Sequence, residues 1–524
     1  MKKSVEIELL PGEVWWGGAV HDGPRMPYGR HPEEAVQVDL RNLLENSGAP
    51  FLVSNRGRYV WQDQPFSFRF QAGVMTIETE ETQGHQSEAD SMRELLAEGF
   101  SNLRGAYRHA SRAYFPAQGR IPDPIAFTAP QYCTWMEMHY EPTQDKTIAY
   151  AQEILRNGFP PGVLIIDDNW MKDYGTWEFQ AERFPDPKRM IDTLHELGFK
   201  VMLWVCPYVS PDSQTGRALA KQGLLVQDLD GRTAIRRWWN GCSAVLDYTY
   251  PPALSWFKEK LDLLVQQYGV DGFKFDAGDP TGNDPDSWVT SFQWKGSNVP
   301  NEDCAAYTTL GHHYPLSEFR ASWKAGGAPL MQRLRDKPHS WGEDGLKSLI
   351  PNAIAQGLAG YPFNCPDMVG GGWDGDLQAT PFDAELFVRY AQCAALFPMM
   401  QFSTAPWKVL DKTGLEYCKA AVQLRVDMGA EIVKLAEAAA VSGEPILRPM
   451  AYEYADSGWE AVYDQFMLGS TFLVAPVLEK GASEREVRFP EGSWQGADGS
   501  VVNGPCTITV DAPLAVLPWY RLVK

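Results

Sequence analysis

The sequence has few cysteines and no long apolar run. Its eight cysteines stand singly among 524 residues, without a Cys-x-x-Cys pair, so no disulfide framework is indicated. No stretch of about 18 apolar residues occurs, which argues against a membrane-spanning helix. Glu6 and Glu8 interrupt the segment after the N-terminal lysines, so a signal peptide is not predicted either. These absences predict a cytoplasmic protein with free thiols.

Positive charge is also scarce. Lys and Arg number 47 against 67 Asp and Glu, for a formal net charge of −20. Clustered Lys and Arg are needed to neutralise nucleic-acid phosphates or anionic lipids, so we expect neither a nucleic-acid partner nor a membrane partner. With 44% hydrophobic and 22% charged residues, the chain is otherwise typical of a globular protein. The composition leaves a homo-oligomer open.

Aromatic residues, in contrast, are abundant, with 19 Trp, 21 Tyr and 24 Phe. Part of this set must lie in the core, because large aromatic side chains gain most when they are buried. Flat aromatic faces also pack against the apolar faces of pyranose rings. At the level of composition, both an aromatic core and a sugar site stay open.

The pattern of apolar residues divides the chain into three regions. Residues 1–118 contain short alternating segments between Gly, Pro, Asn and Asp turns, which predicts an N-terminal β domain. From 119 to 455, β-rich runs alternate with segments of helical spacing, and 456–524 is strand-rich again. We therefore predict an α/β protein with a (β/α)8 TIM barrel at 119–455 and a C-terminal β-sandwich domain. A doubly wound open sheet is the competing architecture.

Eight β-rich runs supply the predicted barrel strands. They lie at residues 126–140, 162–170, 200–209, 270–278, 329–336, 361–370, 398–403 and 445–454. The carboxyl ends of barrel strands meet at one face, where the catalytic sites of such barrels are built. Polar residues that end these runs are therefore the first candidates for a functional site.

Carboxylates end four of the runs. Asp167 and Asp168 end the second run, Asp276 the fourth, Asp336 the fifth and Asp367 the sixth. A single Asp at the end of a strand is commonly the N-cap of the following helix. A buried carboxylate without a partner is costly, so carboxylates at the ends of four strands on one barrel face indicate a functional site. Paired carboxylates in a concave site are typical of glycosidic bond cleavage. We therefore expect a small carbohydrate substrate.

Other catalytic patterns are missing from the sequence. His195 has no second histidine at the spacing of a zinc-binding HExxH helix. The adjacent His312 and His313 face different ways and cannot easily chelate one ion together. Neither a GxSxG motif nor a phosphate-binding GxxxxGKS/T loop is present. We therefore expect no metal and no cofactor.

Several segments resemble glycoside hydrolase family 31. DGFKFDAGD resembles the family's nucleophile segment, and the stretch from Arg320 to Trp341 resembles the one that begins with a sugar-binding Arg and contains the acid/base Asp. PDMVGG resembles a later barrel strand of the family, and DQFMLGSTFLVAPVL resembles the start of its C-terminal β domain. The resemblance covers about residues 122–524.

The resemblance implies a retaining exo-acting α-glycosidase. By position, Asp276 would be the nucleophile and Asp336 the acid/base, reached from the fourth and fifth predicted barrel strands. The substrate-binding set that the resemblance implies is Asp167, Asp168, Trp239, Lys274, Arg320 and Asp367.

Departures from the family pattern bear on the sugar. Lys274 stands where the family commonly has a Trp, and a frequent His near the seventh strand is replaced at about Ser403. The segments FKFDAG, LIIDDNW and PDMVGG, and WWGGAVHDGPRMPYG near the N-terminus, are more similar to the family's α-galactosidase-like branch. We therefore expect α-galactosides as substrates and an N-terminal loop that reaches towards the site. An α-glucosidase or sulfoquinovosidase-like specificity and a non-catalytic sugar-binding protein are the alternatives.

Overall fold

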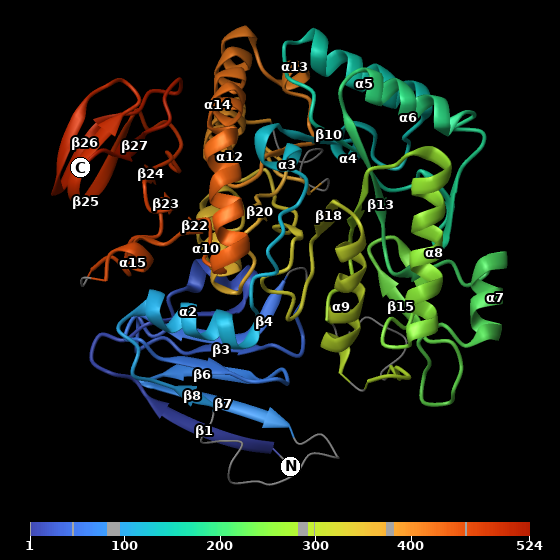
Figure 1. The fold of residues 1–524 in the computed structure, drawn as a ribbon, viewed down its shortest axis with the longest axis horizontal. Helices are drawn as coiled ribbons and strands as arrows, with labels where there is room; N and C mark the ends of the chain where they lie inside the picture. The colour runs from blue at the N-terminus through green and yellow to red at the C-terminus, as the bar shows by residue number, and fades with distance from the viewer. Residues whose placement is uncertain are drawn as a thin grey trace.

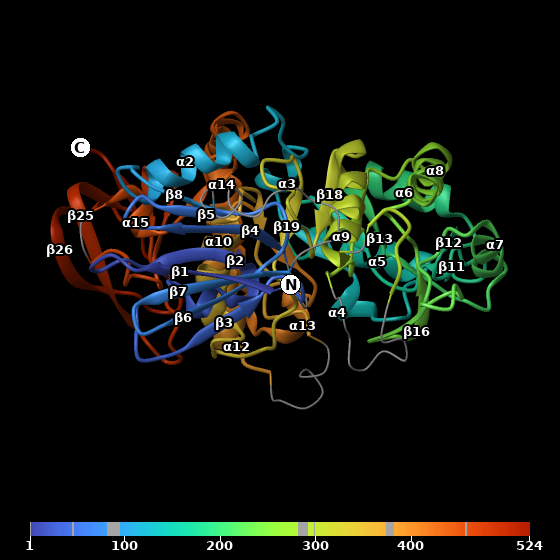
Figure 2. The same cartoon turned by 90° about the horizontal axis from the view of Figure 1, so that it is seen from below.

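The computed structural model describes residues 2–43, 47–80, 95–280, 292–297, 299–373, 382–455 and 458–524. Figure 1 shows a central barrel with a sheet domain at each end of the chain. The N-terminal sheets lie against the half of the barrel that carries α10, as Figure 2 also shows. Residues 456–457, where the C-terminal domain is predicted to begin, lie outside the described residues.

Two antiparallel four-stranded sheets form the N-terminal region. The first has the order β1 (Lys2–Glu8), β7 (Val74–Glu80), β6 (Ser67–Gln71) and β3 (Val36–Asp39). The second has the order β2 (Trp15–Ala19), β4 (Gly48–Ser54), β5 (Tyr59–Trp61) and β8 (Leu96–Ala97). Helix α2 (Leu103–Tyr114) packs on the second sheet, where the ring centroid of Tyr107 lies 6.3 Å from that of Phe51.

Eight parallel strands form the central barrel. In chain order they are β9 (Gln131–Cys133), β10 (Val163–Ile166), β13 (Lys200–Val205), β17 (Gly272–Phe275), β18 (Leu316–Phe319), β19 (Met331–Arg333), β20 (Asn364–Cys365) and β21 (Gln401–Phe402). The end strands β20 and β21 approach each other, and the Met399 N–H donates to Asn364 O at 3.0 Å across the seam. The predicted TIM barrel is confirmed, and the doubly wound open sheet is wrong.

One of the eight predicted barrel strands is wrong. Residues 445–454 contain β22 (Leu447–Arg448), which pairs with β23 (Phe466–Leu468) of the C-terminal sheet, and the short helix α15 (Met450–Glu453). The fifth barrel strand is β18, whose LSEF sequence contains a buried carboxylate and so lacks the apolar run that marks the other strands. Asp336 therefore follows the sixth strand, β19, rather than the fifth.

Helices return the chain between the barrel strands. The longest are α5 (Gln144–Arg156), α6 (Pro187–Glu196), α8 (Pro251–Tyr268), α9 (Pro300–Thr309), α10 (Leu349–Leu358), α12 (Ala384–Ala395) and α14 (Lys412–Ser442). The two ends of α14 carry the signals expected of a helix. Asp411 caps α14 by accepting a hydrogen bond from the Gly414 N–H at 2.7 Å, and the helix ends at Gly443, whose φ of 75° is left-handed.

Two small antiparallel sheets extend the loops after β10 and β13. One pairs β11 (Met171–Asp173) with β12 (Thr176–Phe179), and the other has the order β14 (Tyr208–Val209), β16 (Gly241–Val245) and β15 (Ile235–Trp238). Tyr174 lies at the turn of the first sheet and Trp239 at the turn of the second. Both turns are therefore placed beside the carboxyl face of the barrel.

A six-stranded antiparallel sheet forms the C-terminal region. Its order is β22, β23, β24 (Phe472–Val474), β27 (Trp519–Leu522), β25 (Glu484–Gly496) and β26 (Val501–Asp511). Arg389 of α12 joins this sheet to the barrel by donating to Ala512 O at 2.7 Å and to Ala482 O at 3.0 Å. In the part of the chain that the structure describes, no helix is long and apolar enough to cross a bilayer.

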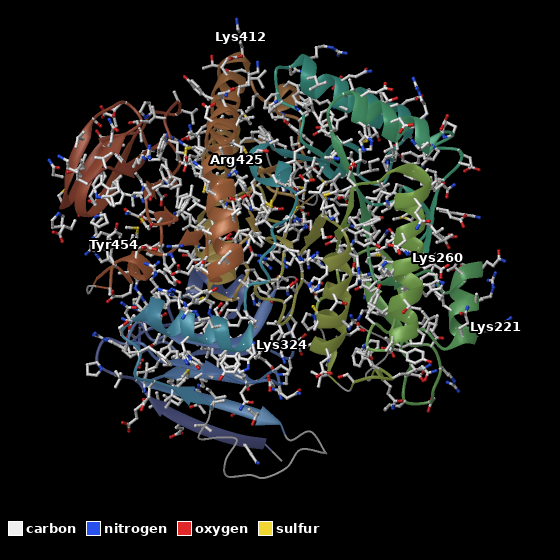
Figure 3. The ribbon with its side chains drawn as sticks, in the orientation of Figure 1. Lys221, Lys260, Lys324, Lys412, Arg425 and Tyr454 are labelled. Atoms are coloured by element: carbon white, nitrogen blue, oxygen red, sulfur yellow. The ribbon has the colours of Figure 1, made fainter. Side chains whose placement is uncertain are left out.

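Arg425 in the middle of α14 (Figure 3) generates a prediction for stability. Its buried guanidinium donates to the backbone carbonyls of Phe127, Ala395 and Pro398 at 2.8 to 3.0 Å. Arg425→Met should lower the free energy of unfolding by about 3 kcal/mol or more, because several buried carbonyls lose their donor. Denaturant unfolding measures the loss. Lys434→Met on the exposed side of the same helix is the control, and a loss at Arg425 as small as the control's would contradict the prediction.

Candidate active site

A cavity of about 310 Å³ opens at the carboxyl face of the barrel. All of the residues predicted for the site except Asp367 line it: Asp167, Asp168, Trp239, Lys274, Asp276, Arg320 and Asp336. These residues come from loops and ends of different barrel strands, as expected for a site at this face. The structure therefore brings together residues that are up to 169 positions apart in the chain, from Asp167 to Asp336.

The backbone turns sharply where two strands deliver their carboxylates. Asn169 follows Asp168 with a φ of 70°, and Ala277 follows Asp276 with a φ of 54°. Both values are left-handed, which is uncommon for residues other than glycine and is concentrated at functional sites. The turns end the buried strands directly after the carboxylates and leave these side chains at the cavity.

Asp276 is surrounded by fixed donors and cations. Its Oδ2 accepts a hydrogen bond from Trp204 Nε1 at 2.9 Å, and its Oδ1 lies 3.4 Å from Arg320 Nε. Burial acts to raise the pKa of Asp276, but the charges of Arg320, Lys274 and Arg333 outweigh burial and lower the pKa well below its usual range. Asp276 is therefore a carboxylate at neutral pH.

Lys274 and Asp167 form a buried ion pair beside Asp276. The Lys274 Nζ lies 2.7 Å from Asp167 Oδ2, and the Cys133 thiol donates to the same oxygen at 3.0 Å. Burial acts to lower the pKa of Lys274, but the adjacent Asp167 carboxylate raises it overall. Lys274 therefore stays an ammonium group at the deep end of the cavity.

Asp168 has a different environment from that of its neighbour. Its carboxyl lies 3.0 Å from the Tyr174 hydroxyl, and among the described residues it has no ion pair with a cation. Burial and the charge of Asp167 raise the pKa of Asp168 to about 8. Asp168 is therefore protonated at neutral pH and can donate a hydrogen bond to a ligand in the cavity.

Arg320 and Trp239 form one wall of the cavity. Arg320 Nη2 lies 2.8 Å from Asp279 Oδ2, which holds the guanidinium in place. The guanidinium carbon lies 5.0 Å from the centroid of the Trp239 ring, a cation–π contact. Trp239 is 50% exposed, so it has free ring surface at the mouth of the cavity.

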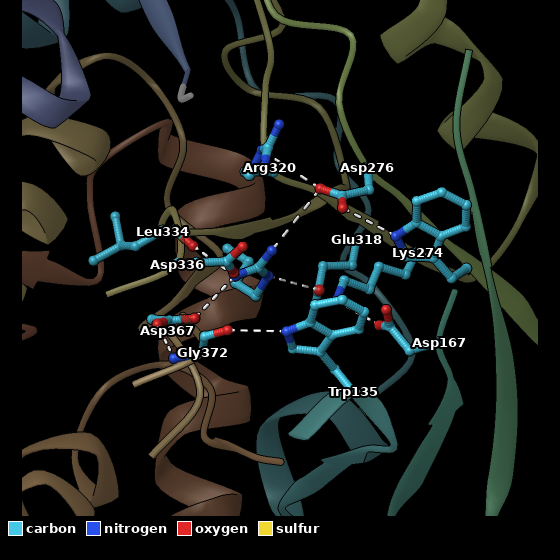
Figure 4. A network of polar contacts seen from close by, with 12 residues as sticks. Trp135, Asp167, Lys274, Asp276, Glu318, Arg320, Leu334, Asp336, Asp367 and Gly372 are labelled. Carbon is cyan, nitrogen blue, oxygen red and sulfur yellow. Dashed lines mark hydrogen bonds and ion pairs between the residues drawn. The ribbon is translucent and has the colours of Figure 1, made fainter. Parts of the chain in front are cut away.

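Asp336 is held by Arg333, for which the sequence left open a role in holding the Asp336 loop and a purely structural role. Arg333 Nη1 lies 2.6 Å from Asp336 Oδ1 and 2.9 Å from Asp367 Oδ1, and Nε lies 3.3 Å from Glu318 Oε1. Figure 4 shows the side chains of Asp336, Asp367 and Glu318 close together, with dashed lines that mark these contacts. Arg333 is only 1% exposed, so its charge is balanced by these carboxylates rather than by water.

Asp367 lies behind the cavity rather than on its wall. Its fully buried carboxyl accepts hydrogen bonds from Arg333, from the Lys337 N–H at 2.6 Å and from the Gly372 N–H at 2.9 Å. Burial and the charge of Asp336 raise the pKa of Asp367 to about 7. Asp367 thus joins the loop that carries Asp336 to the loop at Gly372, and the predicted sugar contact by its side chain does not agree with this position.

Further residues line the cavity, and for two of them, Trp204 and Arg335, the sequence left a role at the site open beside a structural one. These further residues are Trp135, Tyr140, Trp204, Arg335, Met368, Gly372 and Trp373. Trp135 and Trp204 stand at the ends of barrel strands, the same signal that identified the carboxylates, and Trp135 Nε1 donates to Gly372 O at 3.0 Å. Trp373 is 56% exposed, and with Trp239 it makes the mouth of the cavity aromatic.

Some residues considered in the sequence have other partners. Trp341 donates to Asp383 at 3.0 Å and does not line the cavity. The Ser403 hydroxyl donates to Cys133 O at 3.1 Å, a contact within the barrel wall. His21 of the N-terminal segment is near enough to Arg335 for that charge, together with burial, to lower the pKa of His21. The segment therefore approaches the loop of Asp336 without lining the cavity.

The described residues contain no group of three or more His, Cys, Asp and Glu side chains arranged to hold a metal ion. What the cavity offers is a set of acids and bases. Asp276 is ionised beside two arginines, Asp336 is partly open to solvent, and Asp168 carries a proton. Such a division between neighbouring carboxyl groups is the arrangement that acid/base and nucleophilic chemistry needs.

Comparison with known proteins agrees with this geometry. The chain is 32% identical over 543 residues to the myogenesis-regulating glycosidase of Mus musculus, a match that covers 98% of this chain and 75% of the mouse protein. A dextranase of Flavobacterium johnsoniae complexed with glucose has the same fold, with a TM-score of 0.83 at 19% identity over 99% of this chain and 66% of that one. A sulfoquinovosidase from E. rectale also has a TM-score of 0.83, at 18% identity over 100% of this chain and 83% of that one.

Two family models match this chain, and their boundaries agree with those of the barrel and the C-terminal sheet. Residues 122–428 match the family 31 glycosyl hydrolase TIM-barrel domain, and they contain all eight barrel strands. Residues 443–521 match the family's C-terminal domain, and they begin just before β22. The chain therefore belongs to glycosyl hydrolase family 31.

Proposed function

We propose that the protein is a retaining exo-α-glycosidase that hydrolyses terminal α-galactosides. The observation that carries the proposal is that Asp276 and Asp336 line one cavity and both face the guanidinium of Arg333. Their environments differ as the two roles require. Asp276 is buried and ionised, whereas the side chain of Asp336 is 34% exposed and can exchange a proton with solvent or substrate.

In the proposed reaction, the Asp276 carboxylate attacks the anomeric carbon and forms a covalent β-glycosyl ester. Asp336 gives its proton to the glycosidic oxygen as the bond to the leaving group breaks. In the second step Asp336 takes a proton from water, the water oxygen attacks the anomeric carbon, and Asp276 leaves as a carboxylate. Trp204 donates a hydrogen bond to Asp276 and Arg320 forms an ion pair with it, so both hold the carboxylate in position for attack.

The deep end of the cavity supports a galactose-like sugar. Lys274 supplies an ammonium group and Asp168 a protonated carboxyl, while Asp167 supplies an acceptor. Lys274 stands where the family commonly has a flat Trp side chain. Hydrogen-bond donors and acceptors at this position favour recognition of sugar hydroxyl groups, including the axial hydroxyl of galactose. Trp239 and Trp373 at the mouth would then pack against the leaving group.

A second candidate substrate is an anionic sugar such as a sulfoquinovoside. The observation in its favour is Arg335, which adds a cationic side chain to the lining of the cavity next to Asp336. Guanidinium groups recognise sulfonate-like oxygens by charge-assisted hydrogen bonds. An α-glucoside is the remaining alternative on the same scaffold.

A panel of aryl α-glycosides distinguishes these substrates. We expect the highest kcat/KM for the α-galactoside, with lower values for the α-glucoside, α-xyloside, N-acetyl-α-galactosaminide and α-sulfoquinovoside, because the cavity hydrogen-bonds specific hydroxyl groups. Initial rates at matched enzyme concentration give the order. A clear preference for the α-sulfoquinovoside would contradict the proposed α-galactoside specificity and support the anionic sugar as the substrate.

Asp276→Ala tests the nucleophile. It should reduce kcat by on the order of 10⁴-fold or more, because no covalent intermediate can form. Thermal unfolding must show that the variant is folded. Asp212→Ala at an exposed position is the matched control and should retain wild-type activity. Substantial hydrolysis by a pure, folded Asp276→Ala protein would refute the assignment.

The protonated state of Asp168 predicts a pH dependence. Its pKa of about 8 means that kcat/KM should fall as the pH rises through this value, because Asp168 loses the proton that it donates to the sugar. Asp168→Asn keeps an N–H donor but cannot ionise, so its pH profile should lack this fall. If both proteins show the same basic limb, another group is responsible.

A further inference from the structure

Arg333 lies between the two carboxylates of the proposed mechanism. Its Nη2 is 4.0 Å from Asp276 Oδ1, and its Nη1 is 2.6 Å from Asp336 Oδ1. The side chain comes from β19, is 1% exposed and does not line the cavity. The buried guanidinium of Arg333 therefore faces both side chains, with Nη2 towards Asp276 and Nη1 towards Asp336.

Other contacts fix the guanidinium in this position. Nη1 also donates to Leu334 O at 3.0 Å and to Asp367 at 2.9 Å, and Nε lies 3.3 Å from Glu318. Glu318 is held in turn by Gln401, whose amide donates to it at 2.7 Å. With acceptors along three sides, Arg333 has little freedom to turn towards one catalytic carboxylate at the expense of the other.

Negative charge changes place around this guanidinium during the proposed reaction. The proposed double displacement begins with Asp276 as the carboxylate and with Asp336 as the acid. When Asp276 forms its ester, Asp336 has given its proton to the leaving oxygen and is now the carboxylate. The second step reverses both changes. The total charge that faces Arg333 is equal in the two states, but it moves from the Nη2 side to the Nη1 side.

Resting on the proposed function, we propose that Arg333 is a positioning residue that serves both chemical steps by stabilising whichever of Asp276 and Asp336 is ionised. A charge that is already in place for both states needs no rearrangement during the reaction, which is the condition under which buried electrostatic stabilisation is most effective. The same contact to Nη1 also holds Asp336 over the cavity.

Two substrates separate this role from a structural one. The α-glycosyl fluoride of the preferred sugar releases its leaving group without a proton, whereas the methyl α-glycoside needs one from Asp336. Arg333→Lys keeps a positive charge but cannot reach both carboxylates. We expect kcat/KM to fall about 100-fold or more for both substrates, because Asp276 loses one of the cations that face it and Asp336 loses its contact to Nη1.

The alternative results are distinct. A fall for the methyl glycoside alone would mean that Arg333 serves Asp336 only, and unchanged kinetics would remove any role; either result overturns the proposal while the glycosidase function stands. Failure of the wild type to hydrolyse any glycoside would overturn the proposed function itself. Arg425→Lys, another buried arginine of the barrel region, is the control for lost stability and should leave kcat/KM unchanged per folded molecule.

A measurement on the wild type keeps the proposal testable if Arg333→Lys does not fold. Crystal structures of the free enzyme and of the enzyme trapped by a 2-deoxy-2-fluoroglycosyl fluoride should show the guanidinium unmoved, with Nη1 within hydrogen-bond distance of Asp336 in both. A guanidinium that turns away from Asp336 in the trapped enzyme would overturn the proposal.

Discussion

The constraint that governs this site is the balance of charge among the buried side chains at the carboxyl face of the barrel. Carboxylates lie beside cations there, such as Asp167 with Lys274 at 2.7 Å and Asp276 with Arg320 at 3.4 Å. Removing one member of such a pair leaves an uncompensated buried charge, which commonly costs about 3–5 kcal/mol. The arrangement therefore supports its own geometry before any ligand binds.

The same balance sorts the carboxyl groups by protonation state. Asp276 faces cations and stays ionised, whereas burial, together with the charge of a neighbouring carboxylate, raises the pKa of Asp168 to about 8 and that of Asp367 to about 7. The three aspartates therefore differ in state: Asp276 is an anion, Asp168 is a hydrogen-bond donor, and Asp367 connects two loops by hydrogen bonds. Their roles follow from what each one faces, and not from residue type.

The scaffold positions these groups but does not select the sugar. Solved proteins with this fold differ in the substrates named for them, so membership of the family identifies the chemistry more firmly than the substrate. Under the proposed function, Lys274 and Asp168 would distinguish one sugar from another through their hydrogen bonds to its hydroxyl groups. Trp239 and Trp373, which also line the cavity, would contact the leaving group.

The sequence by itself determined the strand–helix alternation, the barrel and the carboxylates at its strand ends, because these features are written in local periodicity and in what directly follows each apolar run. It did not identify β18 as the fifth strand, and it left open whether Arg333 holds the Asp336 loop or is purely structural. Glu318 interrupts the apolar pattern of β18, so the strand is not recognised from the sequence. Its partner is Arg333, 15 positions later, and Arg333 Nε lies 3.3 Å from Glu318 Oε1 because β18 and β19 pair side by side in the barrel. The inward position of Asp367 was likewise decided by tertiary structure, since its hydrogen-bond donors come from separate loops that meet only in the folded barrel.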